Sequence, residues 1–268
     1  MRDWELSITK IGAVVMAALF ALPAYAEIPQ AARDAQVVVL GEQHDNPDHH
    51  ARQAEWVAVL KPAALVFEML TPDQAARADV DWASQAELDA AIGWTGSDWP
   101  SFDMYFPIFA AAPDAAIYGG GVPRDALRAQ LAKPLADHPL AAEFGLSAPL
   151  DAETQAAREA LQAEAHCGAL PDEMLPVMVD AQRLRDAALA EAALRALEAT
   201  GGPVMVITGN GHARTDWGMP ALMAFAAPDL SVFALGQGEN GNAAQGAFAL
   251  TLDAPAPDRG DPCAVFNQ

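Results

Sequence analysis

The feature that most constrains the fold is a short apolar run, Val37-Val38-Val39-Leu40, that stops at Gly41-Glu42-Gln43-His44. A run of this length ended by glycine predicts a strand buried on both faces, as in a parallel sheet. Residues 204–212 repeat the design, with Gly209-Asn210-Gly211-His212 after an apolar run. Because ligands bind beyond the carboxyl ends of strands in open α/β sheets, both turns are predicted to contribute to one site.

Strand-like and helix-like segments alternate along the chain. Strands are predicted at residues 37–40, 64–69, 117–119, 204–208, 230–235 and 247–252. A helix is predicted to follow Asn46, an N-cap residue before a first-turn proline. The interval from about 125 to 200 contains no convincing strand and is predicted to be a helical subdomain over one end of the sheet. The pattern predicts an α/β domain over residues 27–268, with a mainly parallel sheet, helices on both faces and this added helical subdomain.

The N-terminus indicates export. Residues 11–22 are largely apolar, and Ala24-Tyr25-Ala26 fits the small-x-small cleavage pattern of a secretory signal. The stretch is shorter than the roughly 20 residues that span a bilayer, and a retained anchor is the alternative. We therefore expect a signal peptide over residues 1–26, cleavage after Ala26 and a periplasmic location. No cysteine stands at the cleavage point, so a lipoprotein is not expected.

Charge and cysteine content narrow the function classes. The formal net charge of −21 excludes nucleic acid as a natural partner, because duplex binding depends on Lys and Arg neutralising phosphates. Cys167 and Cys263 are the two cysteines of the chain. In an exported protein two cysteines most often form one disulfide, and a free pair or a thiolate metal ligand is the alternative.

Five polar residues follow or end predicted strands: Glu42, His44, Glu68, Arg124 and His212. The carboxyl ends of parallel strands share one edge, so these side chains are expected to meet. Each also has a structural explanation, such as an ion pair of Glu42 with a nearby arginine, or a backbone hydrogen bond of His44.

Two further histidines, His49 and His50, invite a metal interpretation. They are adjacent on the predicted helix and point in different directions, so we expect both to be solvated first-turn residues. The Gly236–Gly241 stretch matches G-x-G-x-x-G but leads into another strand, so a dinucleotide site is not predicted.

One function that the site residues permit is hydrolysis. Glu42, His44 and His212 could hold a divalent transition metal such as zinc, or act as general bases, with Glu68 as partner. No Walker sequence, G-x-S-x-G elbow or H-E-x-x-H motif is present.

Four ordered motifs stand along the chain: residues 38–50, Ala165-His166-Cys167-Gly168 with Leu170-Pro171, Ala181-Gln182-Arg183-Leu184-Arg185-Asp186, and residues 209–218. Together they resemble the ChaN family of haem-binding uptake proteins in the Tiki superfamily. The resemblance implies an α/β core with a helical second domain, haem held between two monomers, and a role in iron uptake that involves a haem receptor or transporter. The wider superfamily includes metalloproteases and resembles erythromycin esterases, so the hydrolase remains the alternative. A scaffold without a working site is a third interpretation.

Haem binding would need an apolar cleft, an axial ligand and basic groups for the propionates. The axial candidates are Tyr105, Tyr118, His44, His212 and His166. Tyr105, in an aromatic-rich helix start, could face a porphyrin or belong to the core. Arg124 and Arg214 are the candidates for the propionates, although either could equally pair with a surface carboxylate.

Overall fold

The computed structural model describes residues 27–78, 82, 84–261, 263 and 264. The expected signal peptide lies outside these residues. Within the described part of the chain, no helix is long and apolar enough to cross a membrane.

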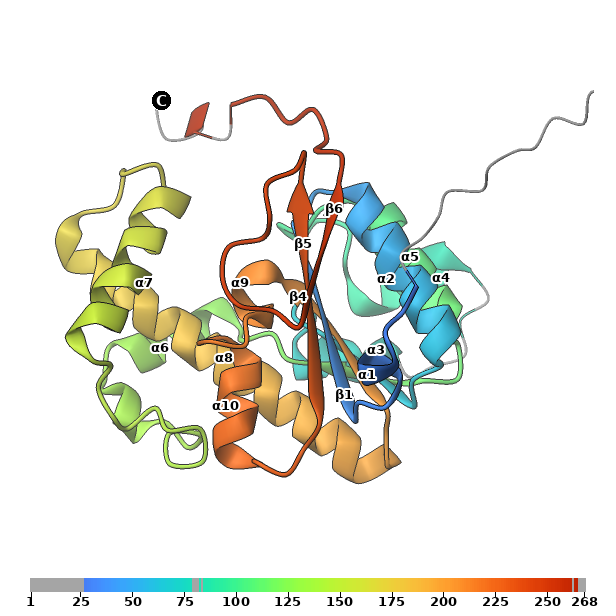
Figure 1. Cartoon of the computed structure of the whole chain (residues 1–268), viewed down its shortest axis with the longest axis horizontal. Helices are drawn as coiled ribbons and strands as arrows, with labels where there is room; N and C mark the ends of the chain where they lie inside the picture. The colour runs from blue at the N-terminus through green and yellow to red at the C-terminus, as the bar shows by residue number, and fades with distance from the viewer. Residues whose placement is uncertain (1–26, 79–81, 83, 262, 265–268) are drawn as a thin grey trace, which may run out of the picture.

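A six-stranded sheet with the order β3-β2-β4-β1-β5-β6 forms the centre of the molecule, and all of its strand pairs are parallel (Figure 1). Its strands are β1 (Val37–Glu42), β2 (Ala64–Phe67), β3 (Ala116–Gly119), β4 (Val204–Gly209), β5 (Val232–Glu239) and β6 (Leu250–Ala254). This confirms the predicted sheet. Strand β5 runs further than predicted, through Gly236 and Gly238, because β6 pairs with this part of the strand.

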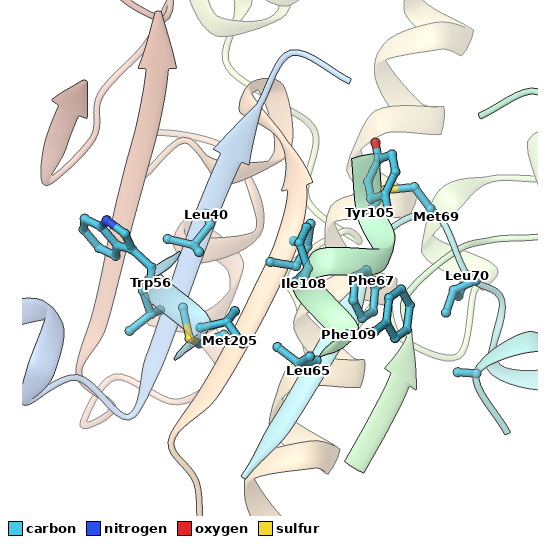
Figure 2. Packing of buried hydrophobic residues seen from close by; sticks show 14 of the residues in the cluster. Leu40, Trp56, Leu65, Phe67, Met69, Leu70, Tyr105, Ile108, Phe109 and Met205 are labelled. Carbon is cyan, nitrogen blue, oxygen red and sulfur yellow. The ribbon is translucent and has the colours of Figure 1, made fainter. Parts of the chain in front are cut away.

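One face of the sheet is covered by an aromatic core. Side chains at alternate strand positions, such as Leu40 and Phe67, pack against the helices α2 (Pro47–Leu60) and α5 (Phe102–Ala111). Figure 2 shows this packing, in which the rings of Phe67 and Phe109 stack with centroids 4.2 Å apart. The shorter helices α1 (Gln30–Arg33), α3 (Pro72–Ala78) and α4 (Gln85–Ile92) complete this side.

The opposite face is covered by small side chains. The long helix α8 (Leu175–Thr200) packs on β2, β3 and β4, together with α6 (Arg124–Leu131) and α10 (Met219–Ala226). Its buried alanines let it lie close to the sheet; they are Ala181, Ala187, Ala190, Ala192, Ala193 and Ala196. Helices thus cover both faces, as predicted.

The interval 125–200 is helical as expected, but α8 lies along a face of the sheet rather than over its end. Helix α7 (Ala152–Ala165) packs on α8, and Arg158 is its one buried residue. Short 3-10 turns at Leu135–Asp137 and Asp172–Met174 complete the interval. A disulfide joins Cys167, just after α7, to Cys263 in the C-terminal tail, and confirms the predicted pairing. The tail runs from β6 toward α7 at the top of Figure 1.

Candidate functional site

A cavity of about 1110 Å³ opens at the carboxyl end of the sheet, between the strand ends and the helices α7 and α8. Six of the residues singled out from the sequence line it: Glu42, His44, Glu68, Arg124, His212 and Arg214. Glu42 ends β1, and His44, Glu68 and His212 follow within three residues of the ends of β1, β2 and β4, because parallel strands all finish at this edge. The chain therefore gathers its strand-end polar groups around one space.

Glu42, the last residue of β1, is fully buried and accepts three hydrogen bonds. The donors are Nδ1 of His44 at 2.8 Å, Nε2 of Gln53 at 2.7 Å and the hydroxyl of Tyr105 at 2.7 Å. Burial opposes its ionisation, but the hydrogen bond from His44 and the neighbouring His50 hold the pKa of Glu42 below its usual value. An ionised Glu42 therefore fixes the proton of His44 on Nδ1.

His44 presents its other ring nitrogen to the cavity wall. Its side chain is 34% exposed, and its Nε2 lies 4.0 Å from Oε1 of Glu68. A Cβ on Gly209 would lie 2.9 Å from this nitrogen, so glycine there leaves room for the imidazole. Burial lowers the pKa of His44, but the carboxylates of Glu68 and Glu42 outweigh it and raise that pKa to about 9.

Glu68, just beyond β2, lies between two imidazoles. It accepts hydrogen bonds from Oγ1 of Thr208 at 2.7 Å and from the backbone N–H of Gly209 at 2.8 Å. Nε2 of His212, in the short helix α9 (Asn210–Ala213), is 3.6 Å from its Oε1. Burial raises the pKa of Glu68, but His212, His44 and these donors together lower it to about 2.

His212 is held from behind by Asp186 of α8, an acid that the strand-end pattern did not reveal. Nδ1 of His212 lies 2.6 Å from Oδ1 of Asp186, and the guanidinium of Arg158 is 3.4 Å from the same carboxylate. Burial raises the pKa of Asp186, while Glu68 and Asp186 raise the pKa of His212 against the effect of burial. In the sequence, Asp186 belongs to the segment 181–186, which was singled out only as one of the motifs that carry the resemblance.

The expectation that His49 and His50 are solvated is wrong, because both are fully buried. Nδ1 of His49 accepts from the backbone N–H of Gln43, and its Nε2 bonds the carbonyl of Gly238. Nε2 of His50 donates to the carbonyl of His44. Both rings therefore fix the loop that carries His44.

Tyr105 is buried behind Glu42 and does not line the cavity. Burial and the adjacent Glu42 raise its pKa, so the structure gives the core position rather than one facing a bound ring. Tyr118 and His166 are also outside the cavity lining. Tyr118 packs on the face of the sheet that α8 covers with its buried alanines, here called the alanine-rich face. Nδ1 of His166 bonds the carbonyl of Gln162.

The two arginines predicted for propionates already have carboxylate partners. Arg124 pairs with Asp98 at the exposed rim. Arg214 pairs with Asp216 and lies over the ring of Trp217, with its guanidinium carbon 3.5 Å from the ring centroid. Arg185 of α8 also lines the cavity, and sequence reasoning did not single it out as a site residue.

The proposed metal ligands do not converge on one point. Glu42 lies behind His44, and its oxygens are taken by Tyr105 and Gln53. The carboxylate between the two Nε2 atoms belongs to Glu68. Among the described residues, no group of three or more His, Cys, Asp or Glu side chains is arranged to hold a metal ion.

Comparisons with known proteins agree with this architecture. Residues 28–223 match the model of a family described as haem-binding uptake, Tiki superfamily, ChaN. A solved structure of ChaN from Campylobacter jejuni, described as showing cofacial haem binding, superimposes with a TM-score of 0.60 at 15% identity, over 81% of this chain and 86% of that chain. No curated protein matches.

Two other solved structures are less similar. The type III effector HopBA1 has a TM-score of 0.43 at 15% identity, over 84% of this chain and 90% of that chain. A succinoglycan biosynthesis protein has a TM-score of 0.40 at 12% identity, over 78% and 67%.

Proposed function

Because the chain belongs to the ChaN family of haem-binding uptake proteins in the Tiki superfamily, we propose that its cavity binds haem and that the protein serves haem or iron uptake. The observation that carries the proposal is the position of His44. A carboxylate holds its Nδ1, and its Nε2 lies at the cavity wall.

The orientation of His44 suits an axial ligand. Histidines that bind metals usually donate their other ring N–H to a carboxylate, which fixes the tautomer and ring orientation. To bind haem iron, His44 would have to release the proton that it carries on Nε2 in the ligand-free protein. Asp186 orients His212 in the same way, but the side chain of His212 is 11% exposed against 34% for His44. His44 is therefore our first candidate and His212 the second.

The rest of the cavity also fits a large flat ligand. Small-molecule sites commonly measure about 300–1,000 Å³, and this cavity is at the upper end of that range or above it. Its lining combines the indole rings of Trp99 and Trp217 with aliphatic groups such as Leu161 and with arginines. Apolar walls with a few cations are what an iron porphyrin with two propionates needs.

Titration of the mature chain with haemin tests the proposal. We expect a saturable, shifted Soret band in the wild type, and a weakened and altered band in His44→Ala. Tyr105→Phe should bind as the wild type does, because its hydroxyl is not in the cavity. His138→Ala is the control, an imidazole outside the cavity lining. Haemin that stays spectroscopically free with every variant would contradict the proposal.

We further propose that the chain is exported to the periplasm and passes haem to a receptor or transporter, dimerising when haem binds. Residues 1–26 and the disulfide, a bond that persists in oxidising compartments, support export. Fractionation of cells and N-terminal sequencing should find a periplasmic chain starting at Glu27. Size-exclusion chromatography with and without haemin tests the dimer.

A metal-dependent hydrolase is the second candidate, favoured by one observation. Two imidazoles with carboxylates behind them point their Nε2 atoms at Glu68. In this version Glu68, rather than Glu42, would complete the ligand set. Elemental analysis of purified protein would favour it if stoichiometric zinc or manganese were found and were lost in Glu68→Gln.

A further inference from the structure

Among the described residues that line the cavity, one arginine has no carboxylate partner. Arg124, Arg158 and Arg214 each pair with an aspartate, and Glu68 lies between two imidazoles. Arg185, by contrast, forms no ion pair or hydrogen bond with any of the described residues. Its nearest charges are Glu68, Asp186 and Arg124, which act on it only at longer range.

The position of Arg185 directs it into the cavity. It lies on α8 in the stripe Gln182, Arg185 and Leu189, and all three side chains line the cavity. Leu189 packs on the alanine-rich face, next to Gly120. Gln182, one turn before Arg185, adds an amide on the same side of the helix.

An anionic group on the ligand would stabilise the charge of the half-buried guanidinium of Arg185. Desolvation lowers the pKa of Arg185 below its usual range, so its surroundings disfavour the charge until an anion arrives. The planar fork of arginine binds a carboxylate through two parallel N–H···O bonds, which are stronger than neutral hydrogen bonds.

We propose that Arg185 anchors a carboxylate of the bound ligand, a propionate if the ligand is haem. This inference rests on the proposed function and assigns to Arg185 the role that the sequence suggested for Arg124 and Arg214. The cavity would then distinguish a porphyrin with free carboxylates from one without them.

The test compares two probes, haemin and its dimethyl ester, whose propionates carry no charge. The wild type should bind haemin more tightly than the diester. Arg185→Ala should weaken haemin binding about 10- to 100-fold and leave binding of the diester unchanged. Arg185→Lys should recover part of the loss, because it keeps the charge without the fork.

Arg195→Ala is the matched control, since Arg195 lies on the same helix, pairs with Glu191 and does not line the cavity. It should behave as the wild type with both probes. Equal haemin affinity of Arg185→Ala and wild type, or no preference of the wild type between the probes, would overturn the inference alone. If the wild type binds neither porphyrin, the proposed function is wrong and the inference falls with it.

Discussion

The two sides of the sheet handle their polar groups in opposite ways. On the aromatic side, the buried side chains of Gln53 and Tyr105 both donate to Glu42, which also holds His44, so these polar groups are satisfied within the fold. On the side of α8, Asp186 and His212 are paired, but Arg185 faces open space. Polar groups satisfied within the fold contribute to stability and orientation, whereas one that faces the cavity has capacity left for a ligand. The comparison predicts that substitutions behind Glu42 act mainly on stability and that substitutions at the cavity act mainly on ligand binding.

The largest loss of stability is expected at α7, the helix of the cavity wall that buries only one of its side chains. Helix α7 buries only Arg158, so the Cys167–Cys263 bond, 96 residues apart, is its main covalent tie. The double variant Cys167→Ser, Cys263→Ser should lose about 4–5 kcal/mol of unfolding free energy, measured by denaturant melts. A change below about 1 kcal/mol would show that α7 is held by its packing alone.

Removing a large side chain from the aromatic core should lower the unfolding free energy slightly less and leave haemin binding unchanged. Phe109→Ala removes a fully buried ring stacked on Phe67 and should cost about 3–5 kcal/mol of unfolding free energy. Haemin affinity of the folded variant should match that of the wild type at a temperature well below both melting points. A loss of haemin affinity in Phe109→Ala would contradict the prediction that this core acts on stability and not on binding.

A smaller loss is expected from the hydrogen bonds of Glu42 themselves. Tyr105→Phe deletes one of the three donors to the buried carboxylate of Glu42, which should cost about 1–3 kcal/mol in a denaturant melt. Trp56→Phe is the control, because it shortens another buried aromatic side chain of the same core and leaves the hydrogen bonds of Glu42 unchanged. No change in Tyr105→Phe would mean that water replaces the hydroxyl.

The remaining effect is a pH dependence of the stability of the ligand-free protein. The folded-state pKa of His44, facing Glu42, Glu68 and Asp45, is about 9 against 6.5, so its contribution is full below pH 6.5 and is lost as pH rises through 9. The pKa of Glu68 is about 2 against 4.5, so its contribution is full above pH 4.5 and is lost as pH falls through 2. Together they predict greatest stability between pH 4.5 and 6.5.

Melting temperatures of wild type and His44→Gln across pH 4–10 measure this dependence. The decline above pH 6.5 should be shallower in His44→Gln. An identical alkaline decline in both proteins would assign it to other groups.

Much of the sheet and of its functional edge could be predicted, because the signals are local. An apolar run stopped by glycine fixes both the strand and the point where its polar side chain emerges, as at Glu42 and His212. The burial of His49 and His50 could not be predicted, because their partners are distant or in a loop. His49 bonds the carbonyl of Gly238, nearly 190 residues away, and His50 bonds the carbonyl of His44. Helix position alone could not reveal those partners.

The missed residues of α8 have a similar explanation. Periodicity shows that Leu184 faces the sheet, but whether Arg185 and Asp186 meet solvent, α7 or a cavity depends on how α8 crosses the strand ends. The partner of Arg124, Asp98, lies 26 residues earlier in the chain and likewise depends on the fold, whereas Arg214 pairs locally with Asp216. The family resemblance identified residues 181–186 as a segment of interest, and only the packing of α8 shows which of its side chains line the cavity.

The central claim, that the cavity binds haem through His44, is tested most directly by the electron paramagnetic resonance spectrum of the ferric haem complex. The account predicts an imidazole-ligated iron in the wild type and in Tyr105→Phe, and loss of that signature in His44→Ala. A phenolate-ligated spectrum that His44→Ala leaves unchanged and Tyr105→Phe abolishes would contradict it.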